Sequence, residues 1–241
     1  MSTSTTLPLI DETRVATTRY LAALTGLDDE SVRLPSVLPG WSRAHVVAHL
    51  SRNADAFTRV LRAASAGETA AMYPSNDVRN AEIDDTVATH DLAGLLDDAR
   101  ESCERLDAAL RENDADPESP YARLDGERPS FPLATLGSRR RAEVVIHHTD
   151  LDLDLRAADW PPGFSEEMVR QRQDEMALAH DGGVSMVLSS TDVPGLWKFG
   201  EGQGPEVHGA VGDLAYWLVG RGDGAGLTCS PGDLPVLGRW R

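Results

Sequence analysis

The sequence lacks the features that would cross-link the chain or anchor it in a membrane. Its two cysteines, Cys103 and Cys229, lie far apart in unrelated contexts, which supports neither a disulfide framework nor a thiolate zinc site. No apolar run approaches the ~20 residues that cross a bilayer. Residues 1–14 lack a basic leader and the apolar stretch of ~7 to 15 residues that secretion requires. We therefore expect a soluble, cytoplasmic protein in which any metal is bound by histidine and carboxylate.

Positive charge is also scarce. The 241 residues include 23 Lys and Arg against 39 Asp and Glu, a formal net charge of −16. Such a chain repels phosphate backbones and anionic lipids at long range, which argues against nucleic acid and membrane surfaces as partners. We expect a small-molecule substrate, with local arginines if it is anionic, and a monomer or weak dimer.

Helical patterns fill the first two thirds of the chain. One runs over residues 7–25 and ends at Gly26, and a second has Ser42 as its N-cap and ends near Gly67. A connector over 66–85 breaks at Pro74, and two further helices are predicted over 91–112 and 133–155. Between these two helices, residues 114–132 are rich in turn formers. Four helices of this kind predict a bundle.

The composition changes after the run Trp160-Pro161-Pro162-Gly163, which stops helical continuation. We place the domain boundary there, with a four-helix bundle over 1–158 and a small α+β domain over 159–241. The second domain is predicted to contain a helix that starts at Ser165, strands over 184–190 and 205–211, and a helix over 211–221. The fold class is α+β.

A histidine points into the predicted bundle from its second helix. At ~100° per residue, the inward face centres on His49, beside Val46 and Asn53 and above Phe57 and Val60. His45 lies toward the edge of this face and reads as a neighbour. A lone inward histidine is more often a hydrogen-bonded core residue than a ligand, so this helix does not by itself predict chemistry.

The fourth helix supplies the second half of a candidate metal site. Glu143 and His147 are four residues apart and project from the same face, which Leu136, Arg140, Leu151 and Asp154 flank. A buried carboxylate is costly unless it is paired or bound to metal, although this spacing also occurs in surface pairs. His49, Glu143 and His147 together make a two-histidine, one-carboxylate set that leaves an open position on a divalent ion. His148 lies ~100° off this face.

The charged residues around this helix have simpler interpretations. Asp150, Asp152 and Asp154 lack the glycine and later glutamate of a calcium loop, and we expect them to continue the helix and either orient His147 or face solvent. The triplet Arg139–Arg141 is interpreted as helix-surface charge, with Arg140 turned inward.

Four segments resemble the mycothiol-dependent maleylpyruvate isomerases, within the wider DinB-like metal-binding superfamily, over nearly the whole chain. They are LPGWSRAHVVAHLSRNADAF, GETAAMYPSNDVRNAEI, RRRAEVVIHHTDLDL and DLAYWLVGRGDG. The resemblance implies an N-terminal four-helix bundle that binds a divalent metal, usually zinc, through His49, Glu143 and His147. It also implies that Arg221, in the Gly220-Arg221-Gly222 segment, and Arg79, in DVRNAEI, lie at the active site and bind the substrate or the thiol.

The resemblance further implies an activity. The thiolate of mycothiol adds to the cis double bond of maleylpyruvate, rotation follows, and elimination gives fumarylpyruvate. Arg79 and Arg221 would hold the carboxylates and stabilise the enolate. Two alternatives stay open: a mycothiol S-transferase that acts on another electrophile, and a non-catalytic metal-binding regulator.

Overall fold

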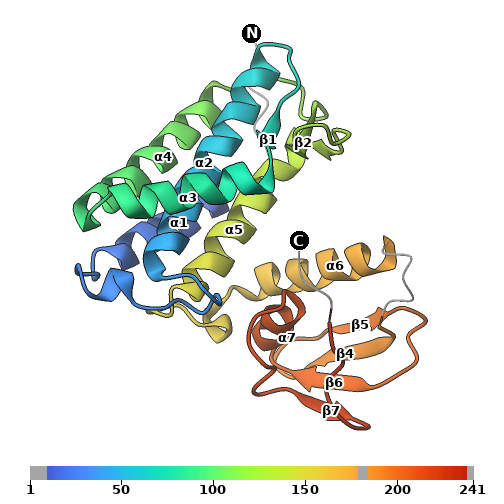
Figure 1. Ribbon diagram of the computed structural model, residues 1–241. Coiled ribbons are helices and arrows are strands. Elements are labelled where there is room, and N and C mark those ends of the chain that lie inside the picture. Colours follow the sequence, from blue (N-terminus) through green and yellow to red (C-terminus); the bar gives the residue numbers. More distant parts are fainter. Residues whose placement is uncertain (1–9, 179–183, 238–241) are drawn as a thin grey trace. The chain divides into compact units, whose positions relative to one another are not determined.

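The computed structural model describes residues 10–178 and 184–237, and divides the chain into two compact units, Met1–Leu153 and Asp154–Arg241. The predicted boundary after residue 158 lies inside a 3-10 turn, Ala157–Asp159. This turn belongs to the second unit, because Trp160 directly after it packs its ring 5.2 Å from that of Phe164 and 5.7 Å from that of Tyr216. The two units are described separately (Figure 1).

The first unit is a helical bundle, and the four predicted helices are all present (Figure 1). The helix α2 packs along α4, and α1 packs along α5. The predicted start of the first helix, at residues 7–9, lies outside the described residues. The bundle helices are α1 (Ile10–Leu24), α2 (Arg43–Ser65), α4 (Leu92–Glu112) and α5 (Leu136–Asp150).

The helix α2 begins and ends where its sequence predicts. Ser42 is its N-cap, and the Ser42 hydroxyl lies 2.7 Å from His45 Nδ1. Gly67, two residues after the last helical residue, has a φ of 74°, a left-handed conformation that glycine adopts without steric cost. This capped start fixes the rotation of α2, and hence the direction of the side chains on its inner face.

The segment predicted as a connector contains a strand and a helix. The strand β1 (Ala71–Tyr73) is followed by α3 (Asn76–Thr89), whose N-cap Ser75 accepts a hydrogen bond from Val78 N at 3.1 Å. The helix was missed because it buries only Ile83 and Thr86, so it has little apolar periodicity. It brings Arg79 against the inner face of α2.

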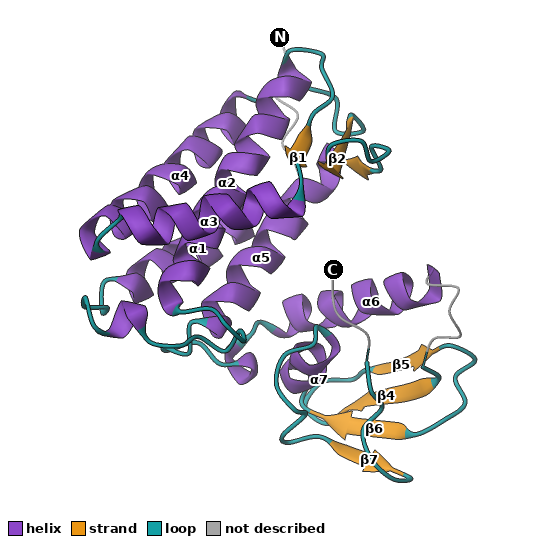
Figure 2. Cartoon of the chain, in the orientation of Figure 1, coloured by secondary structure: helices purple, strands orange, loops and turns teal. Residues whose placement is uncertain are grey.

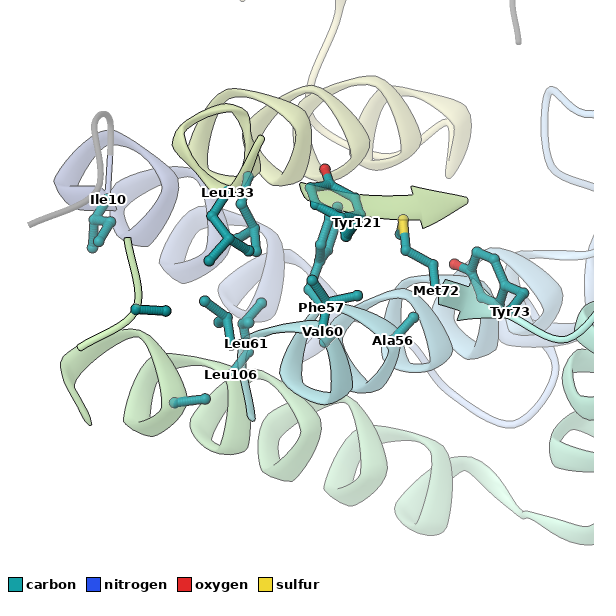
Figure 3. Close-up of a cluster of buried hydrophobic side chains, with 14 residues drawn as sticks. Ile10, Ala56, Phe57, Val60, Leu61, Met72, Tyr73, Leu106, Tyr121 and Leu133 are labelled. Atoms are coloured by element: carbon teal, nitrogen blue, oxygen red, sulfur yellow. The ribbon is translucent and has the colours of Figure 1, made fainter. Parts of the chain in front are cut away.

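A small sheet closes one end of the bundle. Its order is β1, β2 (Pro120–Leu124), β3 (Phe131–Pro132), with β1 parallel to β2 and β2 antiparallel to β3. Ala71 pairs with Ala122, and Tyr73 with Leu124. Buried side chains of this sheet and of α2 and α4 form one cluster, in which Phe57 and Tyr121 meet edge to face at 6.4 Å between ring centroids (Figure 3).

The prediction that α5 continues through residue 155 is wrong. The helix ends at Asp150, and Asp152 adopts a positive φ of 54° that no α-helix accommodates. The guanidinium of Arg43 donates to the carbonyls of Leu151 at 2.7 Å and of Asp152 at 3.1 Å, which satisfies backbone groups beyond the helix end. Asp154 is therefore exposed beyond the helix and does not flank the face of Glu143 and His147.

The arginine triplet on α5 is not simply surface charge. Arg140 is buried as predicted, but Arg141 is buried as well and pairs with Glu12 of α1. Arg139 lies over the ring of Phe131, 3.8 Å from its centroid. All three arginines therefore contact other elements of the bundle.

The second unit is a four-stranded sheet with α6 (Pro162–Leu178) and α7 (Val211–Leu218) on one side (Figure 2). The predicted strands over 184–190 and 205–211 are confirmed as β4 (Met186–Ser190) and β6 (Glu206–Gly209), which are parallel. The predicted start of α6 at Ser165 is wrong, because the helix begins at Pro162, where proline is well tolerated. Two antiparallel strands, β5 (Leu196–Phe199) and β7 (Thr228–Ser230), complete the order β5-β4-β6-β7.

The start of α7 packs closely against the turn that precedes α6. A Cβ added at Gly212 would lie 2.2 Å from the carbonyl oxygen of Ala157, whereas one added at Gly163 would meet no atom within 4 Å. We predict that Gly212→Ala lowers the free energy of unfolding by about 1–3 kcal/mol, because the backbone must shift to relieve the overlap. Gly163→Ala, the same change in the same unit, should be neutral or stabilising. Denaturant unfolding measures both, and equal stabilities would contradict this packing.

Candidate metal centre

The structure brings together three side chains that can bind a metal ion. One ligand atom from each of His49, Glu143 and His147 lies within 4.8 Å of the others. Glu143 Oε2 is 3.0 Å from His49 Nε2 and 3.4 Å from His147 Nε2, and the two imidazole centroids are 4.4 Å apart. Within residues 10–178 and 184–237 this is the one group of three or more such side chains.

Two helices hold this group in place. His49 lies on the inner face of α2, and Glu143 and His147 lie one turn apart on α5. Both histidines are buried, with 2% and 7% of their surfaces exposed, whereas Glu143 is half-buried. The three ligand atoms therefore sit at the inner edge of the bundle and not on a solvated surface.

The protonation states of His49 and Glu143 suit a metal site, whereas His147 holds its proton more tightly than a free imidazole does. Burial, and then the charge of His147, lowers the pKa of His49 to about 4, so this ring is neutral at pH 7 and has a lone pair to offer. The pKa of Glu143 lies well below its ordinary value, because hydrogen bonds to His147 and His49 outweigh the cost of burial. Burial opposes protonation of His147 as well, but Asp150 and Glu143 outweigh it and raise the pKa of this residue.

A buried aspartate supports His147 from behind. Asp150 is fully buried, and its Oδ2 lies 2.8 Å from His147 Nδ1. The backbone carbonyl of Asp150 accepts a hydrogen bond from Val37 N at 2.9 Å, which fixes the end of α5. A carboxylate on one imidazole nitrogen directs the other toward a metal, and here the other nitrogen is the one that faces Glu143. The donor set and its support fit a divalent ion such as zinc.

Arg79 contacts the same group from α3. Its Nη2 lies 3.1 Å from His49 Nδ1. A guanidinium only donates hydrogen bonds, so His49 Nδ1 must accept here, and the ring carries its proton on Nε2, where it faces Glu143. A metal on Nε2 requires the proton on Nδ1 instead. The contact with Arg79 and ligation by a neutral His49 therefore exclude each other.

The other two predicted neighbours lie outside the group. His45 is partly exposed, between Ser42 and Asp84, whose Oδ1 is 3.8 Å from His45 Nε2. His148 is buried elsewhere, with its ring 6.0 Å from that of Tyr20. The ring of Trp41, directly before the N-cap of α2, lies next to His49, with 5.6 Å between the ring centroids.

Arg221 lies in the second unit, directly after α7. Its backbone N–H donates to the Tyr216 carbonyl at 3.0 Å, and its Nη1 donates to the Val219 carbonyl at 3.3 Å. Gly220 and Gly222 on either side have φ values of 72° and 65°, so the tight turn depends on glycine at both positions. The turn presents the guanidinium at the end of a buried helix.

Three buried polar residues, Arg140, Asn53 and Tyr73, are hydrogen-bonded to one another next to the candidate metal ligands, and the sequence does not predict this contact. Arg140 donates to Asn53 Oδ1 at 2.6 Å, and Asn53 Nδ2 lies 3.4 Å from the Tyr73 hydroxyl. All three are at least 95% buried. The sequence predicts the inward turn of Arg140, but Tyr73 lies in a segment without a periodic pattern, so its place beside Asn53 is not predictable from the sequence.

The fold and the site together define a helical bundle that contains a candidate metal site, followed by a small α+β unit. The family model described as "Mycothiol maleylpyruvate isomerase N-terminal domain" matches residues 13–152, and the chain belongs to this family.

Two solved structures are similar over 100% of both chains, at 28% identity. One is a crystal structure of the mycothiol-dependent maleylpyruvate isomerase, with a TM-score of 0.87. The other is a mutant of that enzyme with a histidine replaced by alanine, with a TM-score of 0.86. No protein of curated function matches the chain. None of the described helices combines the length and the apolar character needed to cross a membrane.

The support of His147 by Asp150 can be tested through metal affinity. We predict that Asp150→Asn weakens zinc binding about 10- to 100-fold, as loss of such a partner does in other sites. The pKa of His147 is raised, so a proton competes with zinc and affinity rises with pH until that pKa is passed. The variant loses the carboxylate that raises this pKa, and its affinity should level off at a lower pH.

Zinc titrations of the metal-free protein against a competing chelator, at several pH values, measure both effects. Asp152→Asn is the matched control, because Asp152 is exposed and asparagine tolerates its positive φ. Equal zinc affinities for Asp150→Asn and the unchanged protein would contradict the role of Asp150.

Proposed function

We propose that the protein is a mycothiol-dependent cis-trans isomerase that converts maleylpyruvate to fumarylpyruvate in the cytoplasm. The observation that carries this proposal is the open two-histidine, one-carboxylate group in a chain of this family. Three protein ligands leave at least one position for a further group, which is the arrangement of catalytic and not of structural zinc sites.

We assign the metal, most simply zinc, to His49, Glu143 and His147. When bound, it supplies a positive charge that favours the thiolate form of mycothiol at neutral pH. The protein needs no cysteine of its own for this chemistry. Asp150 holds His147 in the orientation that exposes Nε2, and Trp41 limits the access of water to His49.

The reaction is balanced without any oxidant or net proton transfer. Addition of a thiolate to the cis double bond of maleylpyruvate forms a carbon–sulfur bond and moves the π electrons onto the conjugated carbonyl oxygen as an enolate. The former double bond is now single and rotates. The enolate then returns its electrons, the carbon–sulfur bond breaks, and fumarylpyruvate and the thiolate leave.

The two arginines match the negative charge of this substrate. Arg79 contacts His49 at 3.1 Å, and release of this contact when metal binds would free its guanidinium for a substrate carboxylate or the enolate oxygen. Arg221 is proposed, as an expectation carried over from the family resemblance, to bind an anionic group of the substrate or the thiol. Within its own unit, Arg172 donates to the Leu218 carbonyl at 3.0 Å and steadies the end of α7.

The proposed activity can be measured directly. Purified, zinc-loaded protein should convert maleylpyruvate only when mycothiol is present, and the reaction can be followed by the loss of enol absorbance. His49→Ala should lose both zinc and activity, whereas His45→Ala and His148→Ala should keep zinc, because neither ring belongs to the ligand group. Absence of thiol-dependent conversion would refute the isomerase, and transfer of mycothiol to other electrophiles would favour an S-transferase.

Substitution of Arg79 should change zinc affinity in the opposite direction from substitution of a ligand. Arg79→Ala should bind zinc more tightly than the unchanged protein, by up to about tenfold, because a hydrogen bond worth ~1.5 kcal/mol no longer competes for His49. Its KM for maleylpyruvate should rise, since a cation that binds the substrate is gone. Zinc titration and steady-state kinetics measure the two effects.

The control for this variant is Arg62→Ala, which removes one positive charge from an exposed position of α2. A loss of zinc affinity in Arg79→Ala, or an unchanged KM, would show that Arg79 does not exchange between His49 and the substrate.

A further inference from the structure

Arg140, Asn53 and Tyr73, next to the candidate metal ligands, form a hydrogen-bonded row in which the direction of each hydrogen bond is fixed. It starts at Arg140, which is 1% exposed and donates from Nη1 to Asn53 Oδ1 at 2.6 Å and to the Leu50 carbonyl at 3.0 Å. A guanidinium has no acceptor, so the oxygen of the Asn53 amide must face Arg140. The amide nitrogen then has to face the other way.

That amide nitrogen lies 3.4 Å from the hydroxyl oxygen of Tyr73. An amide nitrogen only donates, so the phenolic oxygen accepts this bond and the phenolic proton is left for a different acceptor. Tyr73 is 4% exposed, and in the described residues no acceptor for this proton is seen. A buried donor of this kind is costly unless something accepts from it.

Tyr73 lies beside the metal group. The guanidinium of Arg79 connects the two, because its carbon lies 5.7 Å from the centroid of the Tyr73 ring while its Nη2 lies 3.1 Å from His49 Nδ1. The hydrogen-bonded row lies one helical turn from the candidate ligands. Asn53 follows His49 by four residues on α2, and Arg140 precedes Glu143 by three residues on α5. Burial, and then the charge of Glu143, raises the pKa of Tyr73, which keeps the phenol protonated near neutral pH.

We propose that Tyr73 is a catalytic hydrogen-bond donor, which donates its phenolic proton to the substrate oxygen that becomes negative when the thiolate adds. This inference rests on the proposed function and names a residue that the reaction requires beyond the metal ligands and the arginines. The bond strengthens as the enolate forms and weakens as it collapses, so it lowers the barrier and not only the energy of the bound substrate. The proton stays on Tyr73 throughout.

Kinetics of zinc-loaded Tyr73→Phe with maleylpyruvate and saturating mycothiol test this role. We expect kcat to fall about 100-fold, as for loss of one oxyanion donor, while KM changes less than about threefold and zinc content stays the same. Tyr121→Phe is the matched control, because Tyr121 is an equally buried tyrosine of the same cluster (Figure 3). Equal losses in the two variants, or a change in KM alone, would overturn the proposal.

The substitution Asn53→Asp tests the direction of the hydrogen bond between Asn53 and Tyr73. An ionised aspartate only accepts hydrogen bonds, so the Tyr73 hydroxyl would donate its proton to the aspartate and could no longer donate it to the substrate, although Tyr73 itself is unchanged. We expect kcat to fall as in Tyr73→Phe, with zinc still bound. A kcat equal to that of the unchanged protein would show that Tyr73 does not depend on Asn53 for its donor role.

Oxalate, a planar dianion, separates this proposal from the isomerase assignment. Zinc-loaded protein should bind oxalate, as measured by calorimetry, and Tyr73→Phe should bind it about tenfold more weakly. If the unchanged protein does not isomerise maleylpyruvate, the proposed function fails, and the oxalate titration alone decides on Tyr73. Failure of the unchanged protein to bind oxalate, or the same affinity in both proteins, would overturn the donor role.

Discussion

The contact of the Glu143 carboxylate with two imidazoles is the constraint on which the bundle depends. A half-buried carboxylate between two helices costs free energy unless positive charge or hydrogen-bond donors surround it. Here the donors come from His49 and His147, at 3.0 and 3.4 Å. Because one histidine is on α2 and the other two groups are on α5, the contact also fixes how these helices face each other. The capped start of α2 and the anchored end of α5, at Ser42 and Asp150, then serve the same alignment.

Much of this could be predicted from the sequence, for identifiable reasons. Long amphipathic helices with capping residues have a strong period, and the spacing of Glu143 and His147 places them on one face without any knowledge of the fold. The helical period of the second predicted helix placed His49 on an inward face, and the family resemblance implied the same three ligands. The end of α5 shows the limit of such patterns. The alternating Leu and Asp residues after Asp150 predict that the helix continues, but it ends there, because Asp152 has a positive φ and Arg43 donates to the carbonyls of Leu151 and Asp152.

The features that the sequence did not predict depend on contacts between segments that lack a periodic pattern of apolar residues. The helix α3 has few buried residues, and the strand β1 has three residues in all, so the sequence predicts only a connector there. Yet these elements carry Arg79 and Tyr73. The direction of the hydrogen-bonded row of Arg140, Asn53 and Tyr73 is likewise a property of three dimensions, since it follows from which atoms face each other and not from residue type alone.

Arg140 and Arg79, which both lie near the candidate metal site of the first unit, differ in the one respect that matters for an anionic ligand. Arg140 is buried, cannot lose its proton, and already donates to Asn53 and to the Leu50 carbonyl, so its role is to orient the residues next to it. Arg79 is half-buried, and its partner His49 is a group that metal binding would take away. With a net charge of −16, the protein repels an anion at long range, so the attraction must come from groups within a few ångströms of the candidate metal site. One fixed and one exchangeable guanidinium would meet this requirement, because the buried charge orients the donors beside it while Arg79 would be released once a metal occupied the proposed site.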